Sequence, residues 1–180
     1  MLSSIGKIFG GQTEPDRGND GPGSTPSEVP EALIKEFFGA IQEHDSDTVR
    51  RLLVDHKTGL TSARFKLDPH SVSFPPEVER DAYTLLGAYL GPLTGLQYSI
   101  LTGKNDIALD ILDATFEQDA KFGSGNTALH LAVLLGETEV VSGLIERGAD
   151  MNLKNKRGYS VVDMSDNPDI LRFLESAEVE

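Results

Sequence analysis

The chain has 180 residues, of which 38% are hydrophobic and 7% aromatic, enough for one elongated domain with tails and a modest core. It contains no cysteine, which excludes disulfides, thiol catalysis and the common cysteine zinc sites and is compatible with a reducing compartment. The net charge of −13 argues against nonspecific nucleic-acid binding, which depends on Lys and Arg that neutralise phosphates, and favours neutral or basic partners unless it serves only solubility.

Residues 1–29 are predicted to be a flexible tail. Residues 11–30 are rich in Gly, Pro, Ser, Asp and Glu and cannot bury enough apolar surface to order themselves. The preceding stretch, MLSSIGKIFG, is either a short docking motif or interfacial anchor, or a frayed terminus, and the frayed terminus is favoured. No stretch approaches the roughly 18 consecutive apolar residues of a membrane span, and no signal peptide is evident. We therefore expect the cytoplasm or the nucleus.

Helical periodicity begins near Pro30. Apolar residues recur at i, i+1, i+4, i+5 and i+8 from Leu33 to Ile41, and a second helix carries an apolar stripe from Val49 to Leu53. Two interpretations remain open. The pair is a degenerate first copy of the repeat described below, which we favour, or a generic capping hairpin of two helices.

Residues 57–92 are predicted to be an insertion. The segment begins loop-like and then places apolar residues from Val78 to Leu90 at i, i+4, i+7, i+8, i+11 and i+12. This spacing predicts an amphipathic helix at about 76–90, which two prolines open and a Gly-Pro pair closes. We expect the insertion either to pack against the repeats or to shape a binding surface.

The strongest pattern is a helix-turn-helix unit, TALHLAVLLGETEVVSGLIERGADMN, at 127–152. A second copy begins 33 residues earlier at Thr94, and a truncated copy begins 33 residues later at Ser160. Each helix alone is too short to be stable in water, so neighbouring units must stack and bury their apolar stripes together.

This period and pattern resemble the ankyrin repeat. Thr127, Ala128, Leu129 and His130 stand where that family has T-P-L-H, with Ala in place of Pro. The resemblance implies an all-α solenoid of stacked repeats with short finger loops and one helical insertion, and it implies that His130 is structural, hydrogen-bonded to the Thr hydroxyl. The predicted boundaries are 1–29 for the tail, 30–177 for the ankyrin-repeat domain (30–56 degenerate first repeat, 57–92 insertion, 93–125 repeat, 126–158 repeat, 159–177 truncated capping repeat) and 178–180 for the C-terminal end.

No motif for catalysis, a cofactor or a metal is found. The Gly-rich stretches lack the Lys and the strand-to-helix context of a phosphate loop, and no Ser, His and Asp set is organised by a recognisable elbow. Carboxylate pairs such as Asp106 and Asp110 fall on helix faces predicted to be solvated. We therefore predict a protein that is not an enzyme and that has no catalytic residue, no cofactor and no metal site.

The leading hypothesis is a monomeric, non-catalytic interaction module or adaptor that binds a protein through the concave face and the fingers implied by the resemblance. Leu134 and Leu135 occupy positions that are commonly polar in the family, so the pair is either an exposed binding patch or is covered by the insertion. A small basic cluster in LKNKRG marks one finger. The candidate contact residues are Leu101, Thr102, Phe122, Leu134, Leu135, Lys154, Lys156 and Arg157.

Two rival functions remain. The first is an acidic escort chaperone for a basic client such as a ribosomal protein or a histone, similar to small acidic ankyrin proteins with that role; the charge of −13 would attract the client. The second is a membrane-proximal adaptor tethered by Met1–Phe9. The partner is predicted to be a protein and not a nucleic acid.

Overall fold

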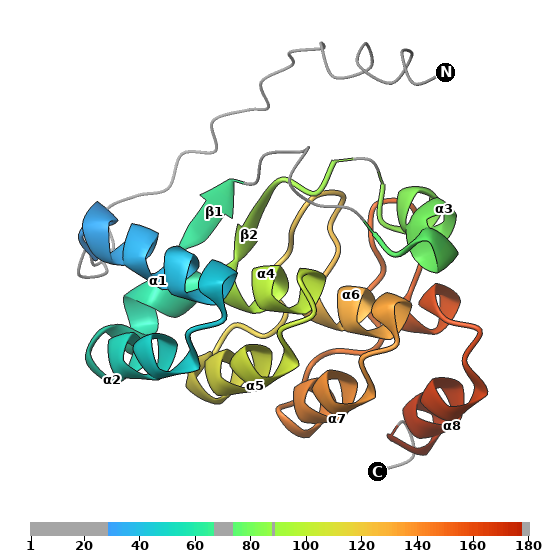
Figure 1. Ribbon diagram of the computed structural model, residues 1–180. Helices are drawn as coiled ribbons and strands as arrows, with labels where there is room; N and C mark the ends of the chain where they lie inside the picture. Colours follow the sequence, from blue (N-terminus) through green and yellow to red (C-terminus); the bar gives the residue numbers. More distant parts are fainter. Residues whose placement is uncertain (1–28, 67–73, 88, 178–180) are drawn as a thin grey trace, which may run out of the picture.

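The computed structural model describes residues 29–66, 74–87 and 89–177. The predicted tail, apart from Val29, and the predicted end at 178–180 lie outside the described residues. Most of the described chain is α-helical, as the sequence predicted (Figure 1). The elements in chain order are α1 (Glu31–Glu43), α2 (Ser46–Ser62), β1 (Arg64–Lys66), α3 (Pro76–Leu85), β2 (Pro92–Thr94), α4 (Gly95–Leu101), α5 (Asn105–Ala114), α6 (Ala128–Leu135), α7 (Thr138–Glu146), the 3₁₀ helix η1 (Val161–Met164) and α8 (Pro168–Ala177).

The helices form two layers. Helices α1, α4, α6 and η1 contact one another in that order along the inner layer, and α2, α5 and α7 follow one another along the outer layer, which α8 continues (Figure 1). The inner helices α4, α6 and η1 have only 7, 8 and 4 residues, and the apolar side chains of the inner layer are shared between the outer helices and the neighbouring inner helices. This arrangement confirms the predicted α-solenoid, in which each unit supplies part of its neighbour's core. Among the described residues, no helix is both long enough and apolar enough to cross a bilayer.

Three of the inner helices begin with the same device. Thr94, Thr127 and Ser160 are the N-caps, spaced 33 residues apart. The side chain three residues further on accepts a hydrogen bond from the N-cap backbone N–H, which satisfies a group that the helix leaves without a partner. The three accepting atoms are Gln97 Oε1 at 3.0 Å, His130 Nδ1 at 3.2 Å and Asp163 Oδ2 at 2.8 Å.

His130 has the structural role that the resemblance implied. Its Nδ1 lies 2.9 Å from Thr127 Oγ1 and accepts from the Thr127 backbone N–H, so the ring proton sits on Nε2, which donates to Tyr159 O at 3.3 Å. The side chain is fully buried. Burial lowers the pKa of His130, because the charged ring would lose its hydration. The folded protein therefore holds this ring neutral.

We expect this histidine to make the stability of the domain sensitive to mildly acidic pH. Because its pKa is lower in the folded state, the unfolded chain takes up the proton first as pH falls. The contribution of His130 to the free energy of unfolding is thus complete above about pH 6.5. Below that pH it falls by at most about 1.4 kcal/mol per pH unit. His130→Gln copies Gln97 of the neighbouring repeat and should flatten this slope. Urea unfolding at about pH 7.5, 6.5 and 5.5 measures it, and equal slopes in both proteins would contradict the assignment.

The first helix pair packs as part of the same stack. Phe37, Phe38 and Ile41 are buried on one side of α1, which contacts α4. Gly95 opens α4 where the next unit has Ala128, and a Cβ at Gly95 would lie 2.6 Å from the Phe37 ring. Glycine is therefore required by the close approach of the large phenylalanine in the first unit.

The insertion is an enlarged finger. Strands β1 and β2 pair antiparallel, with Arg64 opposite Thr94, so the segment that contains α3 connects the two arms of a hairpin between the first and second units. The first repeat was predicted to end at residue 56, but helix α2 continues to Ser62, with non-helical backbone at His56. Helix α3 begins at Pro76 but ends at Leu85 rather than near residue 90.

Candidate partner-binding surface

The C-terminal end of the inserted helix α3 is held by the next two fingers. A helix leaves its last carbonyl groups without partners inside the helix. Here three side chains from finger segments 40 to 73 residues away donate to those carbonyls. The bonds are Arg157 Nε to Thr84 O at 2.8 Å, Asn155 Nδ2 to Leu85 O at 2.8 Å and Asn126 Nδ2 to Leu86 O at 2.9 Å.

Asn155 is the centre of this anchor. Its Nδ2 also donates to Asn126 Oδ1 at 2.8 Å, and its Oδ1 accepts from the backbone N–H groups of Arg157 at 3.0 Å and Tyr159 at 3.1 Å. Both asparagines are buried. A buried amide stabilises the fold only when its partners are in place, so this network fixes α3 at one position. The sequence does not reveal this network, because the uncharged amide of Asn155 lies within the basic cluster LKNKRG and its partners are far away along the chain.

The inserted helix also lies against α6, the helix that carries Leu134 and Leu135. Leu134 is only 6% exposed, and Leu135 is partly buried. In the preceding unit Leu101 is buried and Thr102 is partly buried. The structure therefore does not show the predicted open apolar patch at the ends of α4 and α6. The side chains in this part of the inner layer are packed against neighbouring elements.

The predicted finger residues divide into two groups. Phe122 is 3% exposed and forms a β-bridge with Asn126, so its ring belongs to the core and not to a finger tip. Lys154 and Lys156 are exposed. Arg157 is exposed as a residue, but its Nε is bound to the end of α3. The eight candidate residues therefore do not form one accessible patch.

Two exposed tyrosines stand on the enlarged finger. Tyr83 on α3 is 50% exposed and Tyr89 beyond it is 62% exposed. The Tyr83 ring packs edge-on against Phe74, with centroids 6.5 Å apart. The spacing of the sequence predicts that Tyr89 belongs to the apolar stripe of a helix that extends to about residue 90. Because α3 ends at Leu85, that side chain leaves the helical register and faces solvent.

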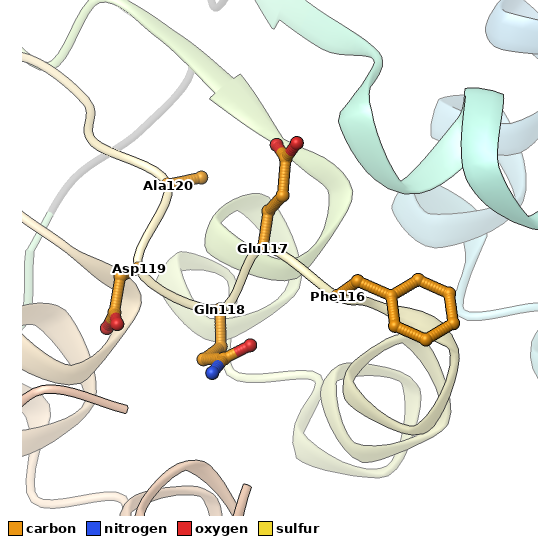
Figure 2. Close-up of a pocket in the computed structure, with 5 residues that line it drawn as sticks. All are labelled: Phe116, Glu117, Gln118, Asp119 and Ala120. Carbon is orange, nitrogen blue, oxygen red and sulfur yellow. The ribbon is translucent and has the colours of Figure 1, made fainter. Parts of the chain in front are cut away.

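A shallow pocket lies at the loop after α5, lined by Phe116, Glu117, Gln118, Asp119 and Ala120. The side chains diverge rather than converge on one point (Figure 2). The Asp119 carboxylate accepts from the Asp150 backbone N–H at 3.1 and 3.2 Å, and burial raises the pKa of Asp119. Phe116 is 75% exposed, and its ring meets the Lys57 ammonium at 4.7 Å. The loop thus joins two units, and its side chains do not form a catalytic constellation.

Comparison with known proteins agrees with the geometry. The family model described as "Ankyrin repeat" matches residues 124–156. Human ankyrin repeat domain-containing protein 29 is 44% identical over 55 residues, which are 31% of this chain and 18% of that protein. Ankyrin repeat-containing protein P1E11.10 of Schizosaccharomyces pombe is 36% identical over 72 residues, 40% of this chain and 35% of that protein.

Human palmitoyltransferase ZDHHC17 is 50% identical over 40 residues, 22% of this chain and 6% of that protein. The chain therefore matches between 6% and 35% of the length of these relatives. The similarity lies in the repeats and does not extend to the whole of any of the three proteins.

Proposed function

We propose that this ankyrin-repeat chain is a non-catalytic adaptor. Its enlarged finger holds a protein partner. Ankyrin repeats are protein interaction modules. We place the contact surface on α3 and the adjoining fingers. We further propose that the protein acts as a monomer in the cytoplasm or the nucleus.

The observation that supports this surface is the exposure of Tyr83, on the anchored helix α3, and of Tyr89, which lies beyond the end of that helix. Tyrosine offers a large apolar ring and a polar tip, and it is enriched among the residues that carry most of an interface's binding energy. An anchored helix loses little conformational freedom on binding, so more of the contact energy remains as affinity. The inner-layer positions of Leu101 and Leu134 are already occupied by intramolecular packing.

The escort of a basic client is less well supported. Two carboxylates of the outer helix layer already link neighbouring units: Asp106 accepts from His44 at 2.7 Å and from Ser46 at 2.9 Å, and Asp110 lies 2.8 Å from Arg50 Nε. These groups are less available to a client than the net charge suggests. The membrane-tether hypothesis depends on Met1–Phe9, which lie outside the described residues.

Affinity capture with matched variants tests the proposal. We expect Tyr83→Ser with Tyr89→Ser to weaken binding of a captured, then purified, partner by about a hundredfold, since two central tyrosines contribute about 1–2 kcal/mol each. The control is Val54→Ser with Phe116→Ser, which removes two comparably exposed apolar side chains elsewhere. Quantitative mass spectrometry of the captures and titration calorimetry measure the effect. If the control loses as much affinity for the partner as the tyrosine variant, or if the tyrosine variant binds the partner like wild type, the interface lies elsewhere.

A further inference from the structure

Basic residues gather on the fingers of this acidic protein. Arg64, Lys66, Lys121, Lys156 and Arg157 are all exposed, and we call this set the finger edge. The finger segments 62–66, 120–127 and 151–162 contain no Asp or Glu, although the chain has 29 acidic residues. The finger edge therefore has the opposite sign from the molecule as a whole.

Hydrogen bonds link the neighbouring fingers that carry the finger edge. Arg64 Nη1 donates to Lys121 O at 3.0 Å, which joins the first finger to the second. The Lys156 backbone N–H donates to Ser124 O at 2.8 Å, which joins the second to the third. Arg157 in turn reaches Thr84 at the end of α3, beside Tyr83. In Figure 1, β1, β2 and α3 lie along the same side of the inner layer.

The charges of the finger edge are not neutralised within the described part of the chain. Elsewhere in that part, six Lys and Arg side chains lie within 4.0 Å of a carboxylate, whereas the five of the finger edge form no such ion pair there. From further away, the Lys121 and Lys154 ammonium groups each favour the charged form of a carboxylate, Lys121 that of Asp119 and Lys154 that of Asp163, without forming an ion pair within the described residues. Among the described residues, the Arg64 and Arg157 side chains donate hydrogen bonds to neutral carbonyls, which fix each guanidinium and leave its charge intact.

We infer that the finger edge binds an acidic, extended segment of a protein partner, whose apolar residues lie against Tyr83 and Tyr89. This inference rests on the proposed function and specifies the partner's chemistry. Fixed guanidinium groups suit carboxylates, and the neighbouring tyrosines suit apolar side chains spaced between them. A continuous polyphosphate fits less well, because it has no apolar groups for the tyrosines and would carry its charge past Glu77, Glu79 and Asp81, which are exposed on α3.

Titration of the isotope-labelled protein with synthetic probes tests the inference. A peptide of four Glu-Glu-Leu repeats should shift the amide resonances of the finger edge, and its affinity should fall as salt increases. Lys66→Gln with Lys121→Gln and Lys156→Gln should weaken it about tenfold or more. The control, Lys35→Gln with Arg51→Gln and Arg172→Gln, changes the net charge equally on exposed helix faces and should bind like wild type.

Three results would overturn the inference. The first is that the acidic peptide does not bind. The second is that the two triple variants weaken binding of the acidic peptide equally. The third is that oligothymidylate binds the same residues more tightly than the acidic peptide does, which would identify a polyphosphate surface. A matching peptide of Lys-Lys-Leu repeats tests whether a basic chain is preferred, and tighter binding of that peptide would also contradict the acidic segment. If a captured partner depends on the tyrosines but not on the finger lysines, the proposed function stands and only the acidic partner is wrong.

Discussion

Replacing Leu129 by alanine is expected to lower the free energy of unfolding of the whole domain by about 2–5 kcal/mol. Leu129 is fully buried in α6, near the middle of the stack, and α6 contacts α4, α7 and η1. The change removes apolar contacts and leaves a cavity that the surrounding helices fill only in part. Few interfaces exist in so short an array, so the loss should be felt throughout it.

Urea unfolding followed by circular dichroism measures this effect. Val54→Ala is the control, since Val54 is exposed on α2 and its truncation should change stability by less than about 0.5 kcal/mol. A change of that small size for Leu129→Ala would mean that the residue does not belong to the shared core.

Replacing Asn155 by alanine is expected to lower the free energy of unfolding by about 2–4 kcal/mol and to release the end of α3. The substitution leaves four groups without partners: Leu85 O, Asn126 Oδ1, and the backbone N–H groups of Arg157 and Tyr159. The lost bond to Asn126 Oδ1 is buried and the other three are partly buried, so full hydration of these groups requires α3 to move away from the fingers. We therefore expect faster amide exchange in 76–86, measured by mass spectrometry, before the rest of the domain unfolds.

Two variants separate the functions of this side chain. Asn155→Asp keeps an oxygen that accepts from the finger backbone but loses the donor to Leu85 O, so it should loosen α3 more than the finger itself. Asn152→Ala changes an exposed asparagine nearby and should leave exchange in α3 unchanged. If Asn155→Ala leaves the exchange of α3 slow, helix packing against α6 alone must hold the insertion.

The tyrosine and lysine experiments depend on this anchor. If α3 is released, Tyr83 loses its fixed position relative to Arg157, and a partner must pay the entropy of ordering both. Asn155→Asp should therefore also weaken partner binding, although it touches neither exposed tyrosine. This links the stability of the enlarged finger to its proposed use as a binding surface.

Much of the repeat architecture could be predicted from the sequence, because its signals are local. Thr94, Thr127 and Ser160 cap helices at one fixed spacing, and His130 takes its Thr127 partner three residues away. In a solenoid each unit contacts mainly its neighbours, so a regular spacing along the chain translates directly into stacking in space.

The placement of the insertion was decided only by tertiary structure. Its anchors join residues 40, 70 and 73 positions apart, and no periodicity in the chain relates Asn126, Asn155 or Arg157 to the carbonyls at the end of α3. A hydrophobic pattern shows that Leu134 must be covered or bound, but it does not show by what. The side chains that reach solvent depend on where the insertion packs against the repeats. Long-range hydrogen bonds between segments that are distant in the sequence determine that position.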